Sequence, residues 1–265
     1  MNIRKAAVAG QFYPANKEEI KKMFEHYNAI VDKSLNDKSV LNLQPKAVIV
    51  PHAGYIYSAF TANIAFRVLQ KSQPKKVVVI GPSHRVYLEG ASVSLYDFFE
   101  TPFGDLKIDN EVAKKLIEKF DLHFEPNAHA EHSTEVQMPF IKYYLPDASV
   151  VEIVYGKEDP LKLSKVISYL IADKETAVVI STDLSHYYDL QQANRLDAIC
   201  LDAVVKVNPQ ELHQGCEACG KIGVEAMLLS AKDLELHPTL LDYRTSADVS
   251  GDKNQVVGYM SAAFS

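Results

Sequence analysis

Three histidines follow three short hydrophobic runs of the sequence. The runs AVIVPH, VVVIGPSH and AVVISTDLSH lead to His52, His84 and His186. Each run is rich in β-branched residues and is bounded by Pro, Gly, Ser or Asp, which is typical of a buried parallel strand. Because ligands of open α/β sheets bind beyond the carboxyl ends of the strands, we expect the three imidazoles to converge at one edge of a sheet.

His52 and His84 are the first candidate metal ligands. Neutral imidazole is the commonest metal ligand in proteins, and two imidazoles at adjacent strand ends suit a zinc, iron or copper ion. The alternative is that each is a loop histidine bonded to the backbone. Because both lie in proline-containing turns after neighbouring strands, the pair favours a metal site.

His186 lies three residues after Asp183 in the segment STDLSHYY. A carboxylate beside an imidazole can orient the ring and raise its basicity, which indicates a general base or a further ligand. The alternative is that Asp183 caps the following turn and His186 packs beside it. The residues alone leave both interpretations open.

The segment HAEHSTEVQMPF is rich in polar side chains. His129 and His132 have the spacing of a metal-binding pair on one face of a helix. Glu131, His132, Glu135 and Gln137 could line a polar pocket, although solvation at the surface explains some of them equally well.

The three cysteines are an odd number in a chain of this length, which does not predict a disulfide framework. Cys216 and Cys219 have the Cys-x-x-Cys spacing, a weak signal alone, because four-thiolate zinc or iron–sulfur sites need two such pairs. Cys219 precedes an apolar segment from Ile222, and a helix N-terminus stabilises a thiolate. We therefore interpret Cys219 as a candidate thiolate ligand and Cys216 as incidental; Cys200 falls within a helical pattern.

The sequence lacks the motifs of several enzyme classes. GPSHR is not the G-x-S-x-G turn of α/β-hydrolases, and there is neither a G-x-G-x-x-G nor a Walker A motif. Ser181, Asp183 and His186 are too close in sequence for the usual catalytic triad. Serine hydrolysis, dinucleotide binding and NTP binding therefore have no support.

Length and composition narrow the class of protein further. The 265 residues contain no repeat or long linker, so we expect one domain over residues 1–265. A net charge of −6 with scattered basic residues argues against a nucleic-acid partner. Neither a signal peptide nor a membrane-spanning stretch is recognisable, so we expect no membrane partner and a cytoplasmic location.

Strand-like and helix-like segments alternate along the chain. We expect strands at 47–50, 77–80, 150–154, 178–180 and 256–264. We expect helices after PHAGY, over 190–207 and 222–229, and after the capping residues Asn16, Asp109 and Asp159. The strands at 47–50 and 77–80 form a βαβ unit and should lie close together. The fold class is therefore α/β: a single-domain sandwich with a central mixed, largely parallel sheet flanked by helices.

Several motifs together resemble those of the Memo family, whose prokaryotic members are often called AmmeMemoRadiSam system protein B. The motifs are, in order, AGQFYP, PHAGYIYS, GPSH, EHSTEVQMPF, STDLSHY, CGK and SGDKNQVVGYMSAAF. The resemblance covers essentially the whole chain. It implies a fold like that of LigB-type class III extradiol dioxygenases, which are non-haem iron enzymes with two histidine ligands, a carboxylate ligand and a catalytic histidine.

The resemblance also implies roles for individual residues. The histidines of PHAGY and GPSH, His52 and His84, would be metal ligands, and His186 would stand in the place of the dioxygenase acid/base. Cys219 of the CGK motif would replace the dioxygenase carboxylate. Asp183 and Tyr57 fall where the family lines its pocket.

A thiolate in place of a carboxylate changes the expected chemistry. A thiolate is softer and favours Cu(I), zinc or a differently poised iron ion. We expect Fe(II) or Cu(I), with zinc as an alternative, in a metal-dependent redox enzyme acting on a small or aromatic-like substrate. One alternative is a non-catalytic scaffold that grips a peptide or partner protein in the same cleft. Another is a zinc hydrolase, and the family name suggests a radical-SAM pathway partner.

Overall fold

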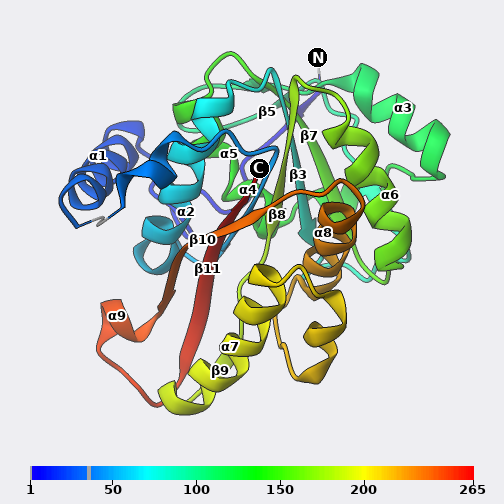
Figure 1. Ribbon diagram of the computed structural model, residues 1–265. Helices are drawn as coiled ribbons and strands as arrows, with labels where there is room; N and C mark the ends of the chain where they lie inside the picture. The colour runs from blue at the N-terminus through cyan, green and yellow to red at the C-terminus, as the bar shows by residue number, and fades with distance from the viewer. Residues whose placement is uncertain (1, 35–36) are drawn as a thin grey trace.

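A mixed β-sheet forms the centre of the computed structural model, which describes residues 2–34 and 37–265 (Figure 1). Its strand order is β10-β11-β2-β8-β3-β7-β4, and β9 pairs with β11. Four neighbouring strands are parallel: β2 (Ala47–Val50), β8 (Thr176–Ser181), β3 (Lys76–Pro82) and β7 (Ser149–Tyr155). The predicted α/β fold with a largely parallel mixed sheet is confirmed.

Antiparallel strands complete both sides of this sheet. β4 (Ala91–Val93) pairs with β7 at one edge. On the other side, β11 (Val256–Phe264) pairs with β2, β10 (Pro238–Thr245) and β9 (His186–Tyr188). All five predicted strands are present, and two of them, β2 and β11, have the predicted bounds. β8 lies between β2 and β3, so the three strands that precede the histidines are consecutive in the sheet.

The two faces of the sheet are covered by different helices. Val48 and Val50 face a core built with α1 (Lys17–Ser34), α2 (Tyr55–Leu69) and α5 (Met138–Tyr144). Ala47 and Ile49 face the opposite core, built with α3 (Asn110–Phe120), α6 (Pro160–Ile171), α7 (Leu190–Val205) and α8 (Lys221–Asp233). Figure 1 shows α1 and α2 on one side of the sheet and α6 and α8 on the other. Because both faces are covered, the parallel strands are mostly apolar, with Glu152 of β7 as a buried exception.

Three helix starts are fixed by the predicted capping residues. Asn16 Oδ1 accepts a hydrogen bond from the backbone N–H of Glu18 at 2.8 Å. Asp109 and Asp159 accept from N–H groups in the first turns of α3 and α6, at 3.0 and 2.9 Å. Each cap satisfies a backbone donor that the helix leaves free, which is why these short polar residues predicted the helix starts.

The remaining elements are short. β1 (Ile3–Arg4), β5 (Phe98–Phe99) and β6 (Leu106–Lys107) make a separate three-stranded sheet. α4 (His132–Glu135) and α9 (Ala247–Ser250) are single turns. The 3₁₀ helices are η1 (Lys38–Asn42), η2 (Gln70–Ser72), η3 (Pro126–His129) and η4 (Pro209–Gln214). Such short elements carry no periodicity that a sequence pattern could reveal.

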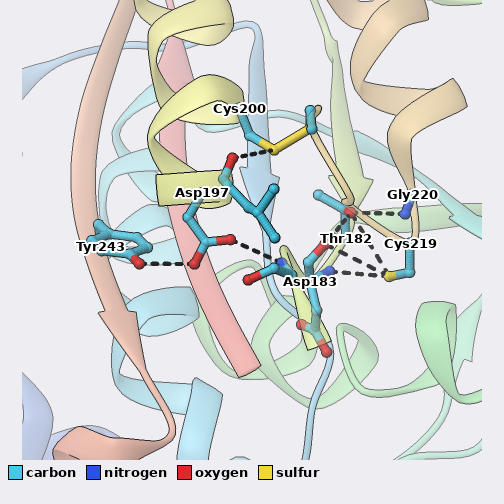
Figure 2. The surroundings of a disulfide bond; sticks show 10 residues. Thr182, Asp183, Asp197, Cys200, Cys219, Gly220 and Tyr243 are labelled. Atoms are coloured by element: carbon cyan, nitrogen blue, oxygen red, sulfur yellow. Dashed lines mark hydrogen bonds between the residues drawn. A yellow bond between two sulfur atoms is a disulfide. The ribbon is translucent and has the colours of Figure 1, made fainter. Parts of the chain in front are cut away.

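A disulfide joins Cys200 of α7 to Cys216, which follows η4 (Figure 2). The interpretation of Cys216 as incidental is therefore wrong. An odd number of cysteines does not exclude a disulfide, because two of the three pair and Cys219 stays a free thiol. Within residues 2–34 and 37–265, every helix is too short or too polar to cross a membrane.

Candidate metal centre

Three imidazoles meet at the carboxyl edge of the sheet. His52 lies two residues beyond β2, His84 two residues beyond β3, and His132 begins α4. Their ring centroids are 5.1 Å apart for His52 and His84, 5.4 Å for His52 and His132, and 4.7 Å for His84 and His132. One ring nitrogen from each lies within 4.8 Å of the others, so the three could hold a metal ion.

The group is buried on one side and open on the other. His52 is 2% exposed, whereas the side chains of His84 and His132 are 30% and 17% exposed. An ion bound here would therefore keep a side open to solvent, as metal sites that act on a substrate require.

The carboxylate of Glu131 orients two of the three rings. Its Oε1 lies 2.8 Å from Nδ1 of His132 and 3.4 Å from Nδ1 of His84. Burial alone would raise the pKa of Glu131, but hydrogen bonds from His132 and His84 outweigh burial and hold this pKa well below its ordinary value. An ionised carboxylate can only accept, so Glu131 favours a proton on Nδ1 of each ring, and in the neutral tautomer that this selects Nε2 is the ligand atom.

Ser181 fixes the ring of His52 in the same tautomer. Its Oγ lies 3.0 Å from Nδ1 of His52 and 2.5 Å from the carbonyl oxygen of Ser133. The single hydroxyl proton goes to that carbonyl, which can only accept, so Nδ1 of His52 is the donor to Ser181. Burial and the neighbouring His84 lower the pKa of His52, which keeps the ring neutral with its Nε2 lone pair free.

Cys219 adds a sulfur to this group from the start of α8. Its Sγ lies 3.3 Å from Nε2 of His52 and 3.3 Å from the backbone nitrogen of Asp183. Burial, with a further contribution from the Asp183 carboxylate, raises the pKa of Cys219 to about 12. Without a metal the sulfur is therefore a thiol that donates to His52, and a metal ion would take the place of that proton.

Close packing around Gly220 explains why the CGK motif has a glycine at this position. A Cβ at this position would lie 2.6 Å from Cβ of Thr182 and 2.8 Å from the carbonyl oxygen of Ser181. The Gly220 N–H instead donates to Oγ1 of Thr182 at 2.9 Å. A residue without a side chain is thus needed for α8 to bring Cys219 against the end of β8 (Figure 2).

Asp183 lies between His52 and Cys219. Its Oδ1 accepts from the backbone N–H of His52 at 2.7 Å. Burial raises the pKa of Asp183, although the hydrogen bond from His52 and the nearby rings of His186 and His132 act in the opposite direction. His186 is half-buried on β9, opposite Val257 of β11. The orientation of His186 by Asp183 stays a prediction.

Glu135 and Tyr57 occupy different positions around this group. Glu135 is fully buried and accepts from the backbone N–H of Ala7 and from the hydroxyl of Tyr13, besides an ion pair with Arg4. It therefore fastens the N-terminal segment to α4. Tyr57, in the first turn of α2, is 38% exposed.

His129 does not form a helical pair with His132. His129 belongs to η3 and is buried, with Nδ1 2.8 Å from Glu152 and Nε2 2.8 Å from Oγ of Ser92. The expectation of a metal pair on one helix face is wrong, because η3 ends between the two histidines. His132, expected as a pocket residue, completes the imidazole group, and the acid/base role of His186 stays a prediction.

The donor set fits a metal ion. Three imidazoles within 4.8 Å of one another are ligands that zinc, iron and copper accept. The hydrogen-bond acceptors behind the rings, Glu131 and Ser181, are the kind of support that orients ligating histidines. Fold and site together define an α/β protein with a candidate three-histidine metal centre at the carboxyl edge of its sheet.

Comparisons with known proteins identify the family. The model of the family described as Memo-like protein matches residues 4–263, so the chain belongs to this family. It is 33% identical to a "MEMO1 family protein" of Aquifex aeolicus, with all of both chains covered. It is 30% identical to "MEMO1 family protein TV1383" of Thermoplasma volcanium, over 98% of this chain and 97% of the relative. A "MEMO1 family protein" of Archaeoglobus fulgidus is 32% identical, over 99% of each chain.

Proposed function

We propose that this protein binds a redox-active metal ion, Fe(II) or Cu(I), through His52, His84 and Cys219. One observation carries the proposal: ring nitrogens of His52, His84 and His132 lie within 4.8 Å of one another, with Glu131 and Ser181 beside their Nδ1 atoms. His132 lies within reach as a further donor. Donors oriented before the ion arrives lose little freedom on binding, which favours affinity.

The proposed reaction is a metal-dependent redox step on a small or aromatic-like substrate. A bound ion would supply the electron transfer. The substrate would enter on the open side, between the partly exposed rings of His84 and His132. His186 would take or return a proton there as general acid/base, and Asp183 would hold the backbone of His52 in place through its 2.7 Å hydrogen bond.

The test is metal analysis of protein purified without oxygen. Wild type is expected to hold close to one equivalent of iron or copper, and His52→Ala/His84→Ala to hold almost none. The matched control is His26→Ala/His213→Ala, which also removes two histidines, both of them exposed, and should keep its metal. Equal metal content in all three proteins would overturn the site.

The identity of the ion decides between redox and hydrolytic chemistry. Histidine and cysteine donors with an open side also suit catalytic zinc. If wild type holds zinc alone and hydrolyses esters in a chelator-sensitive way, the zinc-hydrolase alternative replaces the redox proposal. Iron or copper without such hydrolysis supports the redox proposal.

A second candidate function is a peptide- or protein-binding scaffold. It is favoured by two exposed aromatic side chains, Tyr57 and Tyr187, which are 38% and 72% exposed. Both lie near Tyr259: burial raises the pKa of Tyr259, and Asp183, Tyr57 and Tyr187 add to this effect. Exposed aromatic side chains are typical anchors of binding surfaces. Partner binding that survives full metal removal and Cys219→Ser would support the scaffold, and binding that disappears with the metal would contradict it.

A radical-SAM protein is the proposed pathway partner. The proposal rests on the likeness to AmmeMemoRadiSam system protein B, and the cytoplasmic location is likewise still a prediction. Mixing this protein with a radical-SAM protein encoded in the same genome, followed by size-exclusion chromatography, tests the association. Unchanged elution of both proteins, at concentrations where a weak complex would form, argues against it.

A further inference from the structure

We propose that the Cys200–Cys216 disulfide positions the Cys219 sulfur at the candidate metal centre, so that the redox state of this bond sets the affinity for the ion. The inference deepens the proposed function and rests on it. The two sulfurs of the disulfide come from α7 and from the segment after η4. Cys219 follows Cys216 by only three residues, and it is the free cysteine of the chain.

The short segment between the disulfide and Cys219 is held at both ends. At its far end, the backbone nitrogen of Cys219 lies 3.3 Å from the carbonyl oxygen of Asp183, and Gly220 N–H donates to Thr182. At its near end, Cys216 is bonded to α7. Figure 2 shows the disulfide at Cys200 and, nearby, Cys219 turned toward Thr182 and Asp183. Displacement of Cys216 would therefore reach Cys219 through two intervening residues.

The near end has few other hydrogen bonds, although Cys216 and Ala218 are packed in the hydrophobic core. The backbone N–H of Cys216 donates to the carbonyl of Leu212 at 3.1 Å, and the side chain of Glu217 accepts from the Tyr188 hydroxyl, which raises the pKa of Tyr188. Gly215, just before Cys216, has a φ of +128°, a conformation open to glycine and rarely to other residues.

Reduction must move one of the two sulfurs. A dithiol supplies two electrons and two protons, the S–S bond breaks into two thiols, and the dithiol becomes a cyclic disulfide. The thiols then need a non-bonded separation. Cys200 is held within the regular helix α7, whereas Cys216 lies outside any helix or strand. The displacement therefore falls on the segment that carries Cys219.

Cobalt(II) titration of four metal-free proteins tests this role. They are wild type, Cys200→Ser/Cys216→Ser, Cys219→Ser and the triple variant. Thiolate-to-cobalt charge-transfer absorption reports the sulfur ligand, and competition with a chelator gives the affinity. Loss of the disulfide is expected to weaken cobalt binding about 10–100-fold and to reduce the charge-transfer band when Cys219 is present. In the Cys219→Ser background the same loss should leave the affinity unchanged.

This double-mutant cycle separates positioning from general destabilisation. Equal weakening in both backgrounds would mean that the disulfide acts on the fold and would overturn the inference, as would no weakening in either. If Cys219→Ser itself leaves affinity and spectrum unchanged, the ligand assignment in the proposed function fails instead. Circular dichroism of each protein checks that it is folded.

A chemical version of the cycle covers poor folding of the disulfide variants. Folded wild type and Cys219→Ser are reduced with a dithiol, desalted without oxygen and titrated with cobalt(II). A thiol assay should count two more thiols in each reduced protein than in its oxidised form. Weaker binding after reduction only in wild type supports the inference, and equal binding before and after reduction contradicts it.

Discussion

Glu131 supports His132 in two ways, through its backbone and through its ring. The carboxylate accepts from the backbone N–H of His132 at 2.8 Å, as the N-cap of α4, and it lies 2.8 Å from Nδ1 of the same residue. The start of the helix and the direction of the imidazole therefore depend on one side chain. The same carboxylate also accepts from the backbone N–H of His84.

Glu131→Gln is expected to weaken metal binding about 10–100-fold, the usual cost of losing a carboxylate behind ligating histidines. Glutamine cannot accept from both imidazoles as a charged carboxylate does, so the Nε2 atoms of His84 and His132 are less firmly presented. Chelator competition measures the affinity. Glu125→Gln is the matched control, because Glu125 caps η3 instead, and it should bind metal as wild type does. Equal affinities in both variants would contradict the role of Glu131.

Ser181→Ala should weaken both metal binding and the fold. The variant removes the acceptor for His52 Nδ1–H and leaves Gln137 without a hydrogen bond of 2.9 Å. Unmet buried polar groups cost about 1–3 kcal/mol each in stability. The control is Ser230→Ala, which removes a fully buried serine that bonds only to helix carbonyls of α6 and α8. It should lower stability and leave metal affinity unchanged.

His129→Ala and His132→Ala should affect different properties, stability in the first variant and metal content in the second. His129→Ala leaves the buried carboxylate of Glu152 without its imidazole partner, so the free energy of unfolding should fall by about 3–5 kcal/mol. His132→Ala removes a partly exposed ring and should lower metal content with little effect on stability. Urea denaturation and metal analysis of both variants check this. Loss of metal in His129→Ala at a temperature where it is folded would contradict the separation.

The contribution of Asp197 to the free energy of unfolding should be larger in mild acid than at neutral pH. Burial raises the pKa of Asp197, although its hydrogen bonds with Ser185 and Tyr243 act against this. Between the ordinary aspartate pKa of about 3.9 and the raised value, the folded protein binds more protons than the unfolded chain. Stability contributed by this group is therefore present at low pH and lost as the pH rises through the raised pKa.

Asp197→Asn isolates that effect. The stability of wild type minus that of Asp197→Asn should be larger in mild acid than at neutral pH, as measured by urea denaturation. Asparagine has a similar shape and can still accept from the Ser185 N–H. A difference that does not change with pH would show that Asp197 has an ordinary pKa.

Loss of the disulfide should also reduce stability directly. Cys200 and Cys216 are 16 residues apart, and closing a loop of about this length restricts the unfolded chain by about 3 kcal/mol. Cys200→Ser/Cys216→Ser and fully reduced wild type should therefore unfold at similar, lower urea concentrations than oxidised wild type. Unfolding of reduced and oxidised wild type at the same midpoint would mean that the bond contributes nothing.

The strand cores and two of the clustered imidazoles could be predicted because they depend on local sequence. The β-branched runs of β2 and β11 specify strands whatever lies beside them, and residues that follow parallel strands must appear at one edge. This placed His52 and His84 correctly. His186 lies on the short strand β9, five residues beyond the end of β8 at Ser181, and its role as acid/base beside the pair stays a prediction.

His132 and the disulfide depend on contacts between distant residues. His132 reaches the cluster at the start of α4, which Glu131 caps, and the carboxylate of Glu131 also contacts the backbone N–H of His84, 47 residues earlier in the chain. The pairing of Cys200 with Cys216 depends on how η4 packs against α7. The sequence signal for His132 was the adjacent Glu131, a cap and an imidazole partner in one residue, which no helical or strand periodicity reveals.

The insertion of β8 between β2 and β3 has a consequence for how the protein is made. His52 and Cys219 are 167 residues apart in the chain, and Ser181, which supports His52, arrives only with β8. A growing chain on the ribosome therefore carries its first two candidate ligands long before their supports exist. With the proposed ligand set, loading of an ion would follow synthesis of nearly the whole polypeptide, so the metal would bind finished molecules and not nascent ones.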